Sequence, residues 1–318
     1  MCNMRRLEDP NKKLSFFGRF RKNFRRYWML YLIALPPVIS MIVFSYLPMG
    51  GIILAFKDYS PRLSMWSSNW SKPFWEHFQT AFSGTDFWKV TLNTLRISCL
   101  RLLFGLPAPI LLALLLNEMR HKGYKKLVQT LVYLPHFLSW VVLAGMIKTI
   151  MAGDGMINNA LQSLNLKGIP FLTEENWFVF TLIFTDIWKG MGYGSIIYMA
   201  AISGIDQEQY EAATIDGASR WQKMRFITLP GLKMAVSINV ILSLSGILNG
   251  GFDQIFNLYS PVVYETADII DTYVYRMGIV SGDYGAATAL GLVKSVVGMI
   301  LIISTNKIIK KMGGNPIW

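Results

Sequence analysis

The chain has 318 residues, of which 53% are hydrophobic and only 16% are charged. Soluble domains usually carry roughly 25% charged residues, so this composition excludes an ordinary soluble enzyme and favours a protein with several membrane-spanning helices. The net charge is +12, but Lys and Arg crowd into short segments between long apolar runs, which indicates membrane topology and not nucleic-acid binding.

The amino-terminal residues 1–27 are strongly basic and lead into an apolar run without an A-x-A-like cleavage site. A signal peptide has a shorter basic region and such a site. We therefore predict a cytoplasmic tail that precedes an uncleaved first helix. The two cysteines, Cys2 and Cys99, lie in different environments, and we expect both to be free thiols.

Six windows of the sequence are long and apolar enough to cross a bilayer, which takes about 20 residues of helix. They cover residues 28–50, 90–116, 128–150, 177–203, 235–256 and 285–305. Prolines in the first window are expected to bend or end its helix. The prediction is an all-α integral membrane protein with six transmembrane helices, one membrane domain (28–306) and a cytoplasmic carboxyl-terminal tail (307–318).

The orientation follows from the basic residues, which stay on the cytoplasmic side during insertion. Twenty Lys and Arg residues lie in the two tails and in the second-to-third and fourth-to-fifth connections, whereas the alternate connections hold six. Both termini are therefore predicted to be cytoplasmic.

The outward connections show two patterns. The segment 60–88 is rich in Trp and Phe, as expected of residues at the headgroup level or against another subunit. These are Trp66, Trp70, Phe74, Trp75, Phe87 and Trp88. In the segment 257–284, Ile269, Tyr273 and Val274 are predicted to form one face of a short amphipathic helix.

A search for catalytic or nucleotide-binding motifs finds none. The sequence has no G-x-x-x-x-G-K-[ST] phosphate loop, and His77, His121 and His136 fall in three different regions. The glycines of KGMGYGS (190–194) lie inside a membrane window, where close helix packing or backbone exposed to a pore explains them better than a nucleotide site. If ATP is used, another chain must bind it.

One cytoplasmic segment, residues 204–233, is long and patterned. We predict a helix over Gln207–Ile215, a sharp turn at Gly217, and a second helix that runs to about Ile227 before Pro230 ends it. Its apolar residues pack either under the protein's own helices or in a partner's groove, and the pattern leaves both readings open. They are Ala212, Ala213, Ile215, Ala218, Trp221, Met224 and Phe226.

This segment resembles the EAA loop of binding-protein-dependent ABC importer permeases, E-A-A-x-x-x-G-x(9)-I-x-L-P. The matching residues are Glu211, Ala212, Ala213, Asp216, Gly217, Ala218, Ile227, Leu229 and Pro230. Other stretches, among them YLPHFLSW, DIWKGMGYGSIIYMAAISGID and the ending NPIW, resemble permeases of the maltose type that handle complex oligosaccharides.

The resemblance implies a type I importer fold in a bacterial cytoplasmic membrane. It also implies a second homologous permease, two ATP-binding cassette subunits that carry ATP and Mg, and an extracytoplasmic solute-binding protein that delivers a sugar-type solute. No cofactor or metal is expected on this chain. The EAA residues would couple it to the ATPases.

Charged residues inside membrane windows mark a pathway or a buried pair. Arg101 and Lys148 are expected to snorkel, to pair with Asp186 or to contact solute. Residues that suit sugar binding, several of them matched through the resemblance, make up the predicted pathway: His136, Trp140, Trp188, Lys189, Gly190, Tyr193, Ser243, Asn249 and Asp253. In the resemblance, Ile247 and Gly250 replace amide side chains, which implies a changed specificity.

Helical spacing refines this set. Lys189 and Tyr193 are four residues apart, as are Asn249 and Asp253, so each pair is predicted to share a helix face. Ser243 falls about 120° away from the second face. Two purely structural alternatives stay open. Lys189 and Asp253 could form an ion pair that holds the helices together, and the residues around His136 could serve ordinary helix packing.

Other functions fit less well. A secondary transporter should show inverted repeats with broken helices in both halves, and no such pairing is visible. A membrane-embedded enzyme lacks a convergent catalytic set. Within the importer reading, amino acids or peptides are the alternative solutes.

Overall fold

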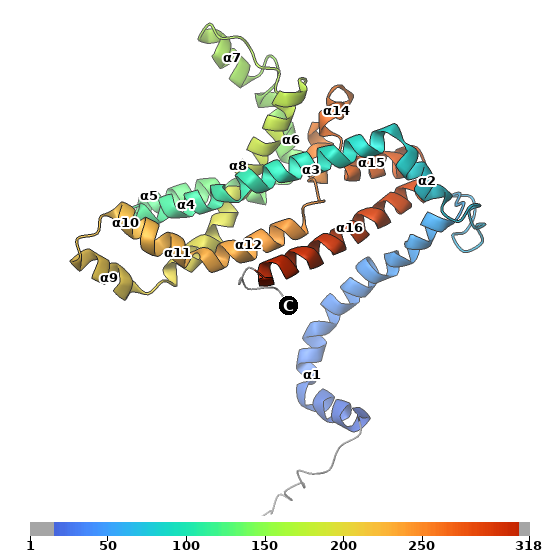
Figure 1. Cartoon of the computed structure of the whole chain (residues 1–318), viewed down its shortest axis with the longest axis horizontal. Coiled ribbons are helices and arrows are strands. Elements are labelled where there is room, and N and C mark those ends of the chain that lie inside the picture. The colour runs from blue at the N-terminus through green and yellow to red at the C-terminus, as the bar shows by residue number, and fades with distance from the viewer. Residues whose placement is uncertain (1–15, 312–318) are drawn as a thin grey trace, which may run out of the picture. The chain divides into compact units, whose positions relative to one another are not determined.

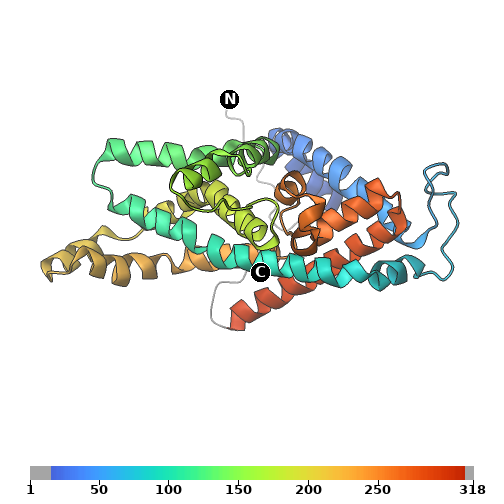
Figure 2. The ribbon, with the colours of Figure 1, turned by 90° about the horizontal axis from the view of Figure 1, so that it is seen from above.

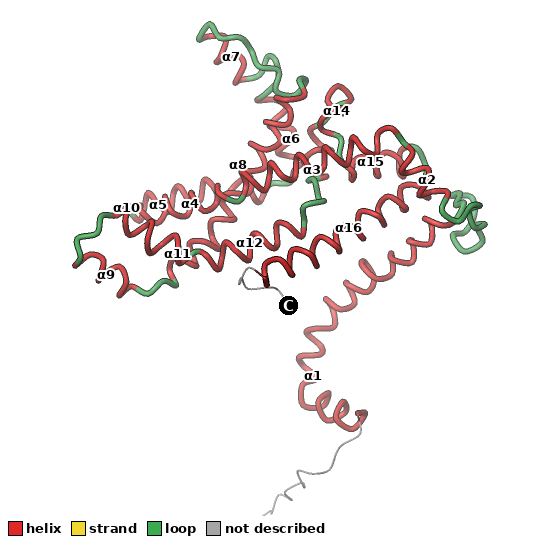
Figure 3. The backbone as a smooth tube through the Cα atoms, in the orientation of Figure 1, coloured by secondary structure: helices red, strands yellow, loops and turns green. Residues whose placement is uncertain are grey.

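The computed structural model describes residues 16–311, which are helical with short connections and contain no strand (Figure 3). This confirms the predicted all-α class. The chain divides into two units, residues 1–53 and 54–318, and each is described by itself.

The first unit consists of one long helical run. It comprises α1 (Phe16–Met41), a π-helical turn (Ile42–Tyr46) and the start of a 3-10 helix (Leu47–Phe56) that continues into the second unit. Tyr27, with φ −121° and ψ 22°, interrupts α1, next to the predicted boundary between tail and span.

The prolines of the first window do not end its helix. Pro36 and Pro37 lie inside α1, Pro48 opens the 3-10 helix, and the apolar run extends to Phe56, six residues beyond the predicted boundary. Local π and 3-10 turns provide new partners for backbone groups that a proline leaves free, so the chain stays helical.

The second unit contains the remaining helices. Figures 1 and 2 place α9 and α10 at one end of this unit and α2 at the opposite end. Their bounds are α2 (Glu76–Ser83), α3 (Thr85–Gly105), α4 (Pro107–Glu118), α5 (Lys122–Tyr133), α6 (Trp140–Ile150), α7 (Met156–Ser163), α8 (Glu175–Ser203), α9 (Gln207–Ile215), α10 (Arg220–Lys223), α11 (Leu229–Gly231), α12 (Lys233–Ser245), α13 (Phe252–Leu258), α14 (Tyr264–Ala267), α15 (Ile270–Tyr275) and α16 (Tyr284–Lys311).

Within residues 16–311, three helical runs are long and apolar enough to cross a membrane: Arg26–Phe56, Asp86–Glu118 and Tyr284–Lys307. Two further stretches pass only as bent pairs, α5 with α6 (106°) and the helix ending at Gly231 with α12 (53°). The 29-residue α8 occupies the fourth window. The third window is thus divided between α5 and α6, and the fifth between α12 and α13. The number of spans stays a prediction.

The long helix α8 organises the core of the second unit. Phe178 and Leu182 of α8 pack with Leu143 of α6 and Ile255 of α13, and all four are fully buried. A second cluster joins α4, α8 and α12 around Tyr198. Because α8 contacts α3, α4 and α5 as well, it positions nearly every residue of the candidate site.

The aromatic residues of the segment 60–88, which extends into α3, are mostly exposed. Their place at the headgroup level or against another subunit stays a prediction. Trp66 is 71% exposed and Trp88 66% exposed, whereas Phe87 is buried. The predicted amphipathic face after α14 is only partly right. Tyr273 and Val274 of α15 pack in one apolar cluster, but Ile269 precedes the helix and is buried in another.

Candidate functional site: a membrane cavity and a coupling loop

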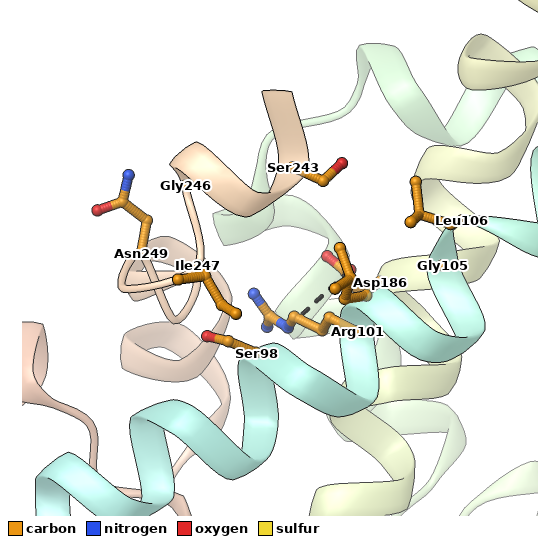
Figure 4. Close-up of a pocket in the computed structure, with 10 residues that line it drawn as sticks. Ser98, Arg101, Gly105, Leu106, Asp186, Ser243, Gly246, Ile247 and Asn249 are labelled. Atoms are coloured by element: carbon orange, nitrogen blue, oxygen red, sulfur yellow. Dashed lines mark ion pairs between the residues drawn. The ribbon is translucent and has the colours of Figure 1, made fainter. Parts of the chain in front are cut away.

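A cavity of about 250 Å³ lies between α3, α8 and the segment that follows α12 (Figure 4). Ser243 and Asn249, both predicted for the solute pathway, line it. Ile247 lines it as well, whereas Gly250 is buried against Ile269. The cavity therefore combines hydroxyl and amide groups with an apolar surface.

The guanidinium of Arg101 is the main charged group of this cavity. Its Nε lies 3.9 Å from Oδ2 of Asp186 on α8, so the pairing with Asp186, one of the alternatives left open for Arg101, is present. Its Nη2 donates a hydrogen bond to Oε1 of Gln254, whose own Nε2 donates to the Leu182 carbonyl and to Oγ1 of Thr185, each at 2.8 Å. The Arg101 side chain is 14% exposed, and its buried Nε makes no hydrogen bond.

The backbone turns sharply beside this guanidinium. Gly251 has φ +85°, and a Cβ there would lie 1.8 Å from Nη1 of Arg101, so only glycine fits. The turn separates α12 from α13. Asn249 precedes it and Asp253 follows it, and the prediction that these two residues share one helix face is therefore wrong.

Asp253 does not join the cavity. Its side chain is exposed in the first turn of α13, and among the residues described it forms no ion pair. Lys189 instead donates hydrogen bonds to the backbone carbonyls of Pro135 (3.4 Å), His136 (3.3 Å) and Leu138. The alternative that Lys189 and Asp253 neutralise each other is also wrong.

A second group of predicted residues meets where the chain breaks between α5 and α6. The His136 ring stacks on Tyr193 with centroids 4.0 Å apart, and the Lys189 ammonium lies 5.2 Å from the centroid of the Trp140 ring. We call His136, Trp140, Lys189 and Tyr193 the break cluster. Lys189 and Tyr193 both contact the segment around His136, so they lie on one side of α8, as their spacing predicts.

The remaining predicted residues of α8, Trp188 and Gly190, do not line the cavity. Trp188 packs against the buried core, and a Cβ on Gly190 would meet open space. A Cβ on Gly192 would lie 2.0 Å from the Val132 carbonyl oxygen of α5, and one on Gly194 would lie 3.1 Å from Pro109 of α4. Close helix packing, one of the two explanations considered for these glycines, holds for Gly192 and Gly194.

Sequence reasoning missed two polar residues in or beside the cavity. Ser98 lines it one helical turn before Arg101 on α3, a spacing that places both on one face and was a usable signal. Gln254 bonds Arg101 from α13, and nothing local in the sequence indicates that contact.

The coupling loop, residues 204–233, forms two helices joined by a tight turn. Helix α9 spans Gln207–Ile215 as predicted, and Gly217 has φ +76°. Hydrogen bonds from Lys223 to Thr214 (2.5 Å) and between the hydroxyls of Tyr210 and Thr228 (2.9 Å) hold the two arms together.

The second arm differs from the prediction in where it ends. It runs from α10 through a π-helical turn (Met224–Thr228) into α11, so the helix continues past Pro230 to Gly231. Pro230 occupies the first turn of α11, where a missing N–H costs little, and the bend follows it.

Three large apolar side chains of the coupling loop are mostly exposed. Ile215 is 88% exposed, Phe226 68% and Trp221 63%, whereas Met224 packs against the protein's own apolar cluster. The predicted coupling residues Glu211, Ala212, Asp216, Gly217, Leu229 and Pro230 are exposed, and Ala213 and Ala218 are half-buried. Among the alternatives left open, the geometry favours a groove on a partner for the exposed three.

No group of three or more His, Cys, Asp or Glu side chains within residues 16–311 is arranged to hold a metal ion. Cys99 is a free, exposed thiol, and Cys2 lies outside the described residues.

Comparison with known proteins agrees with this arrangement. Residues 105–314 match the family described as "Binding-protein-dependent transport system inner membrane component". The chain is 44% identical to protein LplB of Bacillus subtilis, over 89% of this chain and 88% of LplB. It is 41% identical to YteP of the same organism, a polygalacturonan/rhamnogalacturonan transport system permease protein, over 91% of this chain and 90% of YteP.

A solved structure is also similar. A chain of a bacterial alginate ABC transporter, crystallised with an alginate pentasaccharide-bound periplasmic protein, superposes with a TM-score of 0.83 and 41% identity, covering 94% of this chain and 100% of that one. With a family match over most of its length and a chain of an ABC transporter as structural neighbour, the chain belongs to the binding-protein-dependent transport system inner membrane components, membrane permeases of ABC importers and not enzymes.

Proposed function

We propose that this chain forms half of the translocation pathway of an oligosaccharide importer and couples that pathway to ATPase subunits through the coupling loop. The exposed apolar side chains Ile215, Trp221 and Phe226 on a hydrogen-bonded two-helix hairpin carry the proposal. A hairpin with such exposed apolar side chains is suited to bind in a groove on a soluble partner.

The proposed assembly contains a second homologous permease, two ATP-binding cassette subunits with ATP and Mg, and an extracytoplasmic solute-binding protein. Both termini are proposed to be cytoplasmic. An oligosaccharide solute is supported by the names of YteP and of the alginate transporter, and by the hydroxyl and amide groups of Ser98, Ser243 and Asn249 in the cavity. The pathway residues proposed are those of the cavity and of the break cluster.

The test is to purify the tagged chain from cells that produce the whole gene cluster and to identify the proteins that accompany it. An ATPase and a second permease in a stable complex, with oligosaccharide import by that complex in proteoliposomes, are the expected result. A chain that purifies alone and transports solute without ATP would contradict the proposal. A Trp221→Asp, Phe226→Asp variant should lose the ATPase while it stays in the membrane.

A further inference from the structure

The cavity contains more positive charge than a pathway for neutral sugars needs. An ionisable side chain inside a membrane protein is costly and marks function by default. Neutral hydroxyls are satisfied by groups such as Ser98, Ser243 and Asn249, which already line this cavity. The binding of neutral sugars therefore does not explain the positive charge of Arg101.

The guanidinium of Arg101 has unused hydrogen-bonding capacity. It carries five N–H donors in a rigid fork, and the structure gives it one hydrogen bond, from Nη2 to Gln254. Asp186 approaches Nε only to 3.9 Å, beyond hydrogen-bonding distance, so it holds the charge in place without taking up the donors. Figure 4 shows the guanidinium extended from α3 toward Ile247, across the cavity.

The local charge balance is also positive. Asp186 is the carboxylate of the cavity lining and pairs with Arg101. Lys189, three residues further along α8, donates to backbone carbonyls and forms no ion pair among residues 16–311. Arg101 and Lys189 thus stand near a single carboxylate, and Asp253 is exposed and forms no ion pair within the described residues. A second anion would complete the balance.

The shape of the missing anion follows from these groups. Guanidinium pairs best with a planar carboxylate, which accepts two parallel N–H bonds. The volume of about 250 Å³ lies below the roughly 300–1,000 Å³ of pockets for drug-sized ligands. The space suits one sugar ring with its carboxyl group, and not a whole chain.

We propose that Arg101 is the specificity-determining residue of this cavity: it binds a carboxylate of the solute and so selects acidic over neutral oligosaccharides. Ser98, Ser243 and Asn249 would bind hydroxyls of the same ring. This assignment rests on the proposed function, because it requires the cavity to be part of the solute pathway.

The experiment uses the complex of the two permeases and the ATPase subunits in nanodiscs, without the solute-binding protein, which would itself bind the probes. The two probes are trigalacturonate and its fully methyl-esterified, uncharged form. The dissociation constant of each probe is measured for the wild type and for Arg101→Gln. The expected wild-type preference for the acid is about tenfold or more, the size of a charge-assisted hydrogen-bonded contact. Arg101→Gln should abolish this preference and leave the ester's affinity within about twofold.

Two further variants make the result interpretable. Arg96 lies on the same helix but is exposed, so Arg96→Gln removes the same charge and should change nothing. If Arg101→Gln does not assemble, because Asp186 is left unpaired, the double variant Arg101→Gln, Asp186→Asn is measured instead, since removing both members of a pair is better tolerated.

Equal affinity of the wild type for both probes would overturn the proposal, and so would an equal loss of both in the Arg101 variant. In those cases the importer still binds sugar, and the proposed function stands. Absence of binding and of import for both probes in the wild type would contradict the proposed function, and the carboxylate assignment with it.

Discussion

The imidazole of His136 and the phenol ring of Tyr193 lie parallel to within 2°, with centroids 4.0 Å apart. His136 belongs to the 3-10 segment between α5 and α6, and Tyr193 to the central helix α8. Lys189, one turn earlier on α8, donates to carbonyls of the same segment. Any change in the angle between α5 and α6 therefore disturbs both contacts at once.

Replacing Tyr193 tests whether this stack serves transport. Tyr193 is 48% exposed, and an aromatic pair contributes only about 0.5–1.5 kcal/mol, so Tyr193→Ala should assemble normally. We expect import by the reconstituted complex to fall, while Tyr193→Phe retains it. Tyr124→Ala, which removes another exposed tyrosine, serves as control. Undiminished import by Tyr193→Ala would remove the break cluster from the pathway.

Asp186 and Asp253 both lie in predicted membrane windows, but their replacement should affect stability differently. Asp253 is exposed and forms no ion pair within the described residues, so Asp253→Asn should leave assembly and thermal stability unchanged. Asp186→Asn leaves the buried Arg101 without its counter-charge, and we expect up to about 3 kcal/mol of destabilisation. Thermal unfolding of the purified complexes measures both. A large effect from Asp253→Asn would show that a partner subunit covers it.

The glycines of α8 predict a contrast within one helix. A Cβ at position 192 would collide with the Val132 carbonyl, whereas one at position 190 meets open space. Gly192→Ala should cost about 1–3 kcal/mol through overpacking, and Gly190→Ala should be neutral or slightly stabilising. The midpoint of thermal unfolding distinguishes them, and equal midpoints would mean that α5 does not pack here in the assembled importer.

The turn of the coupling loop gives a prediction about ATPase activity. Gly217 has φ +76° and no neighbour near its Cβ position, so Gly217→Val introduces backbone strain and no clash, at about 1–2 kcal/mol. Solute-stimulated ATPase activity of the complex should fall, whereas solute binding persists. Gly123→Val, at an equally open position in α5, is the matched control. Full stimulation in Gly217→Val would show that this turn is not the coupling element.

Topology is checked with single cysteines in a background without Cys2 and Cys99. An impermeant thiol reagent added to intact cells should label Ser67→Cys, in the exposed connection before α2, and not Asn315→Cys near the carboxyl terminus. Labelling of Asn315→Cys before the membrane is opened would reverse the predicted orientation.

Sequence reasoning succeeded where the structure depends on neighbouring residues. The bounds of α9 follow from local signals, because Asp206 caps its first turn by accepting from the Glu208 N–H and Gly217 supplies the left-handed turn after its end. The EAA pattern falls on this same hairpin. Both features lie within a dozen residues of each other.

The angles at which the helices of the third and fifth windows bend have no local signal of that kind. A hydropathy window averages apolar character and contains nothing about backbone direction, so the 106° change between α5 and α6 leaves the average unaltered. The pairing of Arg101 with Asp186 was one of several alternatives, because it joins residues 85 positions apart. Only the packing of α3 on α8 selects it and sets Asp253 aside.

The exposed apolar side chains of the coupling loop have a consequence for how the importer is produced. A chain synthesised in excess of its ATPase would display Ile215, Trp221 and Phe226 to the cytoplasm, where such side chains are the features that chaperones and membrane proteases bind. Under the proposed function, the amount of permease that accumulates would then follow the supply of its partner. Subunit stoichiometry would be maintained by degradation of the unpaired chain, without a dedicated regulator.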